Sequence, residues 1–155
     1  MKSNEILKSS LIIFYALLAG QIIFLIISLY VVSLDVIETN SDLSLVLIFS
    51  VLLLLSPLLI AGPIIYRRFI LSQSDKCKTL EQKLVLYRQG MIIKLAMVEG
   101  ASIFSIVCFL ITGNFLFVVI ALILIILFAF HKPSSEKFAS DFNLSLSEIE
   151  DYNRN

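Results

Sequence analysis

The stretch from Leu11 to Leu34 contains no charged residue. A helix that crosses the hydrocarbon core of a bilayer needs about 20 apolar residues, with about 17 as the lower limit. Three further apolar stretches follow at 43–66, 91–112 and 114–131. Hydrophobic residues make up 59% of the 155 residues and charged residues only 15%, which is more apolar surface than a soluble domain of this size can bury. We therefore expect an all-α protein built as a bundle of four transmembrane helices.

The basic residues lie in alternate connections between these stretches. Lys2 and Lys8 precede the first stretch, six basic residues occupy the loop 67–88, and the segment after the fourth stretch carries Lys132 and Lys137. The connections 35–42 and 113–114 contain no lysine or arginine. By the positive-inside rule, we expect a multi-pass protein of the plasma (inner) membrane with both termini in the cytoplasm. The formal net charge of zero argues against a nucleic-acid partner.

The chain divides into a transmembrane domain, residues 1–132, and a cytoplasmic amphipathic tail, residues 133–155. Thr79 and Gln82 have the spacing of a capping box, which predicts that the third helix begins near Leu80, before the bilayer. Gly113-Asn114 predicts a tight turn between the third and fourth helices. In the tail, paired aromatic residues and a second capping box predict two short helices: Phe138 with Phe142, then Ser145 with Glu148. These helices lie on the protein's own loop, on lipid headgroups, or on a partner.

A shift of the sequence by 80 residues aligns the first apolar stretch with the third. Ala16 and Gly20 then meet Ala96 and Gly100. Small residues four apart let helix backbones approach closely within a membrane, so we expect the first and third helices to pack through them. The alignment indicates two duplicated helical hairpins; the alternative is a chance match in an isoleucine-rich composition.

Polar residues interrupt the apolar stretches at one depth. Glu99 lies about 17 Å along the helix from Arg88, well inside the hydrocarbon. A carboxylate at this depth must be neutral, paired or in contact with water. Gln21 and Ser56 lie at similar depths. Pro57 lacks an N–H, so the carbonyl of Leu53 is left without its usual helical donor, and a protonated Glu99 or the Gln21 amide could donate to it where the helices pack. We expect these residues to form a buried polar layer around Glu99.

Residues 88–107 contain Arg88-Gln89, Met91-Ile92-Ile93 and Ala96-x-x-Glu99-x-Ala101-x-Ile103-Phe104-x-x-Val107. This run resembles the carboxylate-bearing helix of ATP synthase subunit c and the related rotary proteolipids. The resemblance implies that Glu99 is an ion-carrying carboxylate. It does not extend to the preceding segment, because 51–65 is leucine-rich where the family has a glycine-rich helix.

The sequence holds no phosphate-binding loop, no catalytic triad pattern and no metal-ligand spacing, so we expect neither an enzyme nor a bound cofactor or metal. Two functions fit the remaining features. The first is a small non-catalytic membrane protein that serves as an accessory or assembly component. The alternative is a proteolipid-like subunit that translocates a proton or cation with Glu99, Gln21 and Ser56 as its ion-binding residues. Beyond the lipid bilayer, the expected partners are further copies of the chain or a larger membrane complex.

Overall fold

The computed structural model describes residues 3–34, 39–74, 77 and 79–142, and all regular structure among them is helical. The elements in order are α1 (Ser3–Ser33), the single 3-10 turn η1 (Ser41–Leu43), α2 (Ser44–Ser74), α3 (Leu80–Thr112), α4 (Phe115–Phe130) and α5 (Ser135–Asp141). The chain is therefore an all-helical bundle, as the sequence predicts. The second tail helix, expected at Ser145–Glu148, lies outside the described residues.

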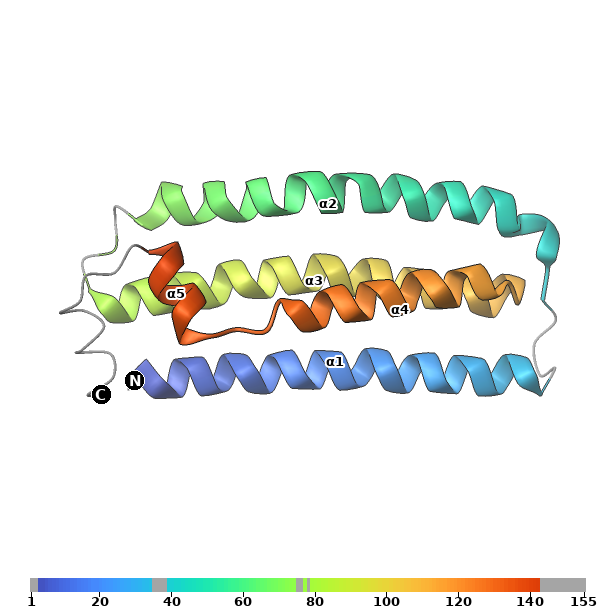
Figure 1. Cartoon of the computed structure of the whole chain (residues 1–155), viewed down its shortest axis with the longest axis horizontal. Helices are drawn as coiled ribbons and strands as arrows, with labels where there is room; N and C mark the ends of the chain where they lie inside the picture. The colour runs from blue at the N-terminus through green and yellow to red at the C-terminus, as the bar shows by residue number, and fades with distance from the viewer. Residues whose placement is uncertain (1–2, 35–38, 75–76, 78, 143–155) are drawn as a thin grey trace.

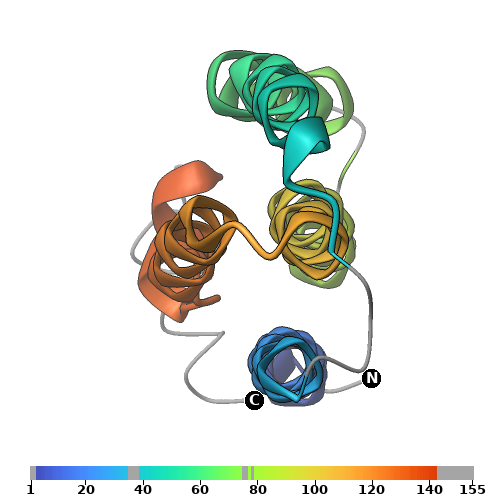
Figure 2. The same ribbon diagram turned by 90° about the vertical axis from the view of Figure 1, so that its right-hand side faces the viewer.

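The four long helices lie side by side, with α1 and α3 running in one direction and α2 and α4 in the other (Figure 1). In the end-on view α3 lies between α1 and α2, and α4 lies beside α3 (Figure 2). Because α1 and α2 lie on opposite sides of α3, they pack on α3 and not on each other as a hairpin, whereas α3 packs against both α2 and α4. The two expected hairpins are thus not equivalent in their packing.

The core of the bundle follows a seven-residue pattern. One row of buried residues along α3 recurs at spacings of three or four: Leu84, Tyr87, Met91, Leu95, Val98, Ser102, Ser105, Phe109 and Thr112. This is the pattern of helices that pack as in a coiled coil. The buried residues of α1 are Ser10, Phe14, Gln21, Leu25 and Ser28, and each precedes a buried residue of α3 by 81 positions. The inward faces of α1 and α3 therefore share one register.

Local chemistry sets the ends of the helices. Thr79 and Gln82 form the predicted capping box at the start of α3, with the Gln82 N–H donating to Thr79 Oγ1 over 3.3 Å. Gly113 ends α3 with a left-handed φ of 65°, and Asn114 caps α4 by accepting from the Leu116 N–H. Both the early start of α3 and the Gly113-Asn114 turn are confirmed.

The short helix α5 packs against the first turns of α3 (Figure 1). Ser134 caps α5, and the buried ring of Phe138 meets the ring of Tyr87 edge-on with centroids 5.5 Å apart. Phe142 packs against Phe138 in turn. The first of the two expected tail helices is confirmed, and it lies on the protein's own third helix.

Within the described part of the chain, two helices are long and apolar enough to cross a membrane, over Lys8–Ser33 of α1 and Glu81–Thr112 of α3. Shorter apolar helical segments cover Ser44–Leu55 and Phe115–Phe130.

Candidate functional site

The small residues expected to join α1 to α3 lie on the outside of the bundle. Ala16, Gly20, Ala96 and Gly100 are all exposed, and a Cβ atom added at either glycine would meet no atom within 4 Å. The two helices do pack together, but through the seven-residue pattern that carries Phe14 and its buried neighbours. The buried faces of α1 and α3 correspond at an offset of 81 residues, whereas the sequence repeat has an offset of 80. The small residues that the repeat pairs are therefore on the outer surface of both helices.

Gln21 lies at the centre of the inward face of α1. Its side chain is 0% exposed, and neither the amide nitrogen nor the amide oxygen has a hydrogen-bond partner. Ser102 of α3 is also 0% exposed, and its hydroxyl likewise has no partner. Burial of a polar group without a partner costs about 1–3 kcal/mol, so each of these residues lowers the free energy of unfolding.

Gln21 and Ser102 occupy the same level of the bundle. On one side of them Phe14 and Leu95 belong to one buried cluster, and on the other side Leu25 and Ile106 belong to the second. Gln21 lies between Phe14 and Leu25 on α1, and Ser102 occupies the matching position between Leu95 and Ile106 on α3. The two unpartnered groups therefore lie at one level of the bundle, between the two apolar clusters.

Other buried hydroxyls near this level are hydrogen-bonded. Ser28 donates to the carbonyl of Phe24 in its own helix over 2.7 Å, and Ser105 donates across to the carbonyl of Phe117 in α4 over 3.0 Å. Near the far end of the bundle, the buried Ser44 hydroxyl also lacks a partner. Among these residues, Gln21 and Ser102 are the two that combine full burial, a shared level and unmet hydrogen-bonding capacity.

Glu99 lies at the edge of the buried face of α3. It precedes Ser102 by three residues, which places it about 4.5 Å along the helix axis and about 60° around it. The Glu99 side chain is partly exposed, whereas Ser102 points into the bundle. Glu99 therefore borders the polar pair rather than lying at its centre.

Ser56 and Pro57 lie within α2, but their side chains are outside the described part of the chain. The helix continues through Pro57 to Ser74. Of the expected ion-binding residues, Gln21 lies at the level of Ser102, which is three residues from Glu99 on α3. The sequence analysis missed Ser102. A serine at a seven-residue core position of α3 is the signal that could have identified it.

These three residues supply oxygen atoms of three kinds: an amide, a hydroxyl and a carboxyl group. Oxygen ligands suit hard cations, and the same groups can share or pass on a proton. The set is equally able to hold helices together through hydrogen bonds within a membrane. The geometry thus defines a polar site in an apolar bundle without selecting one of these uses.

No protein-family model matches the chain, and neither a curated protein nor a solved structure is significantly similar to it. The likeness of residues 88–107 to the rotary proteolipids remains a prediction from the sequence.

Proposed function

We propose that this chain is a small, non-catalytic integral membrane protein that crosses the bilayer four times and serves as an accessory or assembly component. One observation carries the proposal: the outer surface of the bundle is apolar, like its core. Large apolar side chains are exposed on α1, α2 and α4, among them Ile12 at 70%, Leu53 at 75% and Phe130 at 72%, while Gln21 and Ser102 are buried. Soluble monomers rarely expose such continuous apolar surfaces.

The dimensions of the helices support four crossings. The 31 residues of α1 and of α2 and the 33 residues of α3 each exceed the length that a bilayer core of about 30 Å requires. The 16 residues of α4 span only about 24 Å. Local thinning of the bilayer and the flanking Asn114 and His131 accommodate such a difference at modest cost.

The distribution of charge supports an orientation in the plasma (inner) membrane with both termini cytoplasmic. Lys8, Arg68, Arg88 and Lys132 lie in the half of the bundle that holds the starts of α1 and α3 and the ends of α2 and α4, while the opposite end carries Asp42 and no basic residue among those described (Figure 1). Basic residues accumulate on the cytoplasmic side of membrane proteins.

Duplication of an ancestral hairpin is a proposal that rests on the sequence repeat alone, because α1 and α2 lie on opposite sides of α3 and do not pack as a hairpin equivalent to α3 and α4.

The cytoplasmic end supports a role in assembly. The first turns of α3 extend past the end of α4, and α5 folds back on them through Phe138. This gives the membrane domain a small helical platform next to the membrane, which suits contact with a partner complex or with further copies of the chain.

The test of membrane insertion is extraction of native membranes with alkaline carbonate. The chain should stay in the pellet and dissolve only in detergent, whereas release into the alkaline supernatant would contradict an integral location.

The test of the assembly role is purification in a mild detergent after cross-linking in cells. A discrete complex should be recovered and should be lost in a Phe138→Ala variant that undocks α5. Recovery of a lone monomer under these conditions would overturn the assembly role.

A second candidate function is translocation of a proton or cation at Glu99. The observation that favours it is the pair of buried, unpartnered groups on Gln21 and Ser102, because Ser102 lies three residues from Glu99 on the same helix. The test is labelling with a hydrophobic carbodiimide, which reacts with protonated carboxyl groups within lipid. Glu99 should be labelled, and protons or a specific cation should change the rate of labelling.

Two variants make the carbodiimide test decisive. Glu99→Gln should abolish both labelling and transport into vesicles, whereas Glu81→Gln, at an exposed residue in the first turn of the same helix, should alter neither. A Glu99→Gln variant that assembles and functions normally would leave Glu99 with a structural role and would reject translocation.

A further inference from the structure

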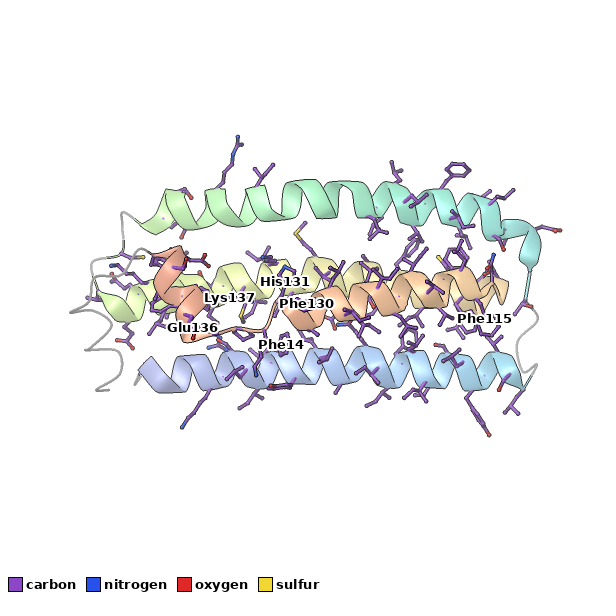
Figure 3. The ribbon with its side chains drawn as sticks, viewed as in Figure 1. Phe14, Phe115, Phe130, His131, Glu136 and Lys137 are labelled. Atoms are coloured by element: carbon purple, nitrogen blue, oxygen red, sulfur yellow. The ribbon has the colours of Figure 1, made fainter. Side chains whose placement is uncertain are left out.

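A pocket of about 460 Å³ lies where α4 ends, between α3 and α5. Its charged lining comes from Lys94 of α3, His131 at the end of α4, and Lys137 and Asp141 of α5, and its apolar lining includes Met91 and Phe130. Figure 3 shows Phe130, His131 and Lys137 gathered at this point, with α5 folded over the start of α3. None of these residues belongs to the polar site around Gln21.

The charged groups of the pocket give it an excess of positive charge. Lys94 and Lys137 oppose the single carboxylate of Asp141, which is close enough to Lys94 to act on it electrostatically. Lys137 is held in position because its Nζ donates to the carbonyl oxygens of Phe130 and Lys132, over 2.9 and 3.2 Å. An ammonium group fixed at a helix end in this way can also donate to an anion, since it has three hydrogens.

His131 adds a group that responds to an anion. Its Nδ1 lies 2.7 Å from the carbonyl oxygen of Leu127 and donates to it, so Nε2 is the nitrogen left for the pocket. Burial lowers the pKa of His131, and the positive charges of Lys94 and Lys137 lower it further, against the opposing effect of the Leu127 hydrogen bond. An anion in the pocket would offset both lysines and favour the imidazolium form. The titratable groups that face His131 across the pocket are Tyr87 and Lys94 of α3 with Lys137 and Asp141 of α5.

We propose that this pocket binds the phosphate headgroup of an anionic membrane lipid. The ammonium groups of Lys94 and Lys137 attract the phosphate, and Nε2 of His131 can donate to it once the ring is protonated. The carboxylate of Asp141 can accept from a headgroup that carries a hydroxyl or amine. The apolar lining and the exposed ring of Phe130 argue for a lipid over free phosphate, because they offer a surface for the glycerol and acyl chains. This proposal rests on the proposed membrane location, in which the end of α4 marks the cytoplasmic boundary of the bilayer.

The chain offers a direct probe, because His131 is its single histidine. The full-length protein is placed in nanodiscs of phosphatidylcholine, with or without phosphatidic acid, and the imidazole is titrated by NMR. The lipid phosphate should raise the pKa of His131, and the same concentration of inorganic phosphate added to phosphatidylcholine discs should not. Equal shifts with inorganic phosphate would overturn the lipid in favour of a free-anion site, and no shift with either would overturn the pocket as an anion site.

A matched pair of variants localises the binding. Lys94→Gln should weaken the retention of phosphatidic acid about tenfold in native mass spectrometry, as expected for the loss of one charge-assisted contact. Lys132→Gln should retain the lipid, because Lys132 is exposed and lies over the ring of Tyr15, 5.6 Å from its centroid, outside the pocket. If both variants lost phosphatidic acid equally, general surface charge would explain its retention, and the proposal would be overturned. Carbonate extraction reports on the membrane location separately, so failure of the lipid site and failure of the membrane assignment are distinguishable.

Discussion

The hydroxyl of Ser105 donates a hydrogen bond across the helix interface to the carbonyl oxygen of Phe117, over 3.0 Å, and so ties α3 to α4 inside the apolar core. Contacts of this kind contribute to helix association within membranes, where the hydrophobic effect between helices is absent.

Substitution of Ser105 should therefore weaken the α3–α4 hairpin. We expect Ser105→Ala to lower the free energy of unfolding by about 1 kcal/mol, measured by unfolding with sodium dodecyl sulfate in mixed micelles. The matched control is Ser50→Ala, because Ser50 bonds only to the Val46 carbonyl of its own helix. A loss as large in the control as in the Ser105 variant would show that the interhelical bond has no special role.

Aromatic stacking joins α1 to α4 in the buried cluster on the other side of Gln21 and Ser102. The rings of Phe14 and Phe128 lie 5.2 Å apart at an angle of 15°, and both are buried. Phe14→Ala should cost about 2–3 kcal/mol, below the range of about 3–5 kcal/mol for core phenylalanines of soluble proteins, because lipid replaces water as the reference in the proposed membrane setting. Ile12→Ala, at a position that is 70% exposed, should lower the free energy of unfolding by only a small fraction of the loss expected for Phe14→Ala. Equal costs in the same unfolding assay would contradict the inward orientation of Phe14.

The helix ends follow from the sequence because their chemistry is local. Thr79 and Gln82 need only each other to form a capping box, and Gly113-Asn114 needs only its own backbone preferences to end one helix and cap the next. Neither depends on how the helices are arranged in space, so both could be predicted from a few neighbouring residues.

The inward faces of the helices do not follow from the sequence in the same way. Apolar residues surround α1 on every side, so hydrophobic periodicity gives no direction, and the small residues Ala16 and Gly20 pointed to the wrong face. Gln21 was identified because an amide is conspicuous in this helix. Ser102 was missed because a serine in an apolar helix is common, and its seven-residue spacing from Leu95 and Phe109 becomes informative only once the inward face of α3 is known.

The buried amide of Gln21 should be replaceable without harm to the fold. Gln21→Leu has a similar volume and removes two unpartnered atoms, so we expect unfolding to become harder by about 1–2 kcal/mol or to stay unchanged. The measurement is again unfolding in mixed micelles. Marked destabilisation by Gln21→Leu would show that the amide has partners in the membrane, and would strengthen its assignment to an ion or hydrogen-bonding site.

The turn between α3 and α4 should tolerate only glycine at position 113. Its φ is 65°, and a Cβ atom there would lie 3.2 Å from Oγ1 of Thr39. Gly113→Ala should cost about 1–2 kcal/mol from the left-handed backbone alone. Gly100→Ala serves as the control, since its added Cβ meets open space within a helix and should be neutral or slightly stabilising. If Gly113→Ala left the free energy of unfolding unchanged while Gly100→Ala lowered it, the left-handed turn at Gly113 and the open space at Gly100 would both be contradicted.

The most direct measurement is the accessibility of single cysteines to a membrane-impermeant maleimide in sealed cells. Cys77, kept as the sole cysteine by Cys108→Ser, and Ser140→Cys in a cysteine-free background should react only after the membrane is opened. Asn40→Cys and Asn114→Cys, in the same cysteine-free background, should react from outside. Labelling of Cys77 from outside, or of Asn40→Cys and Asn114→Cys from opposite sides, would contradict four crossings with both termini in the cytoplasm.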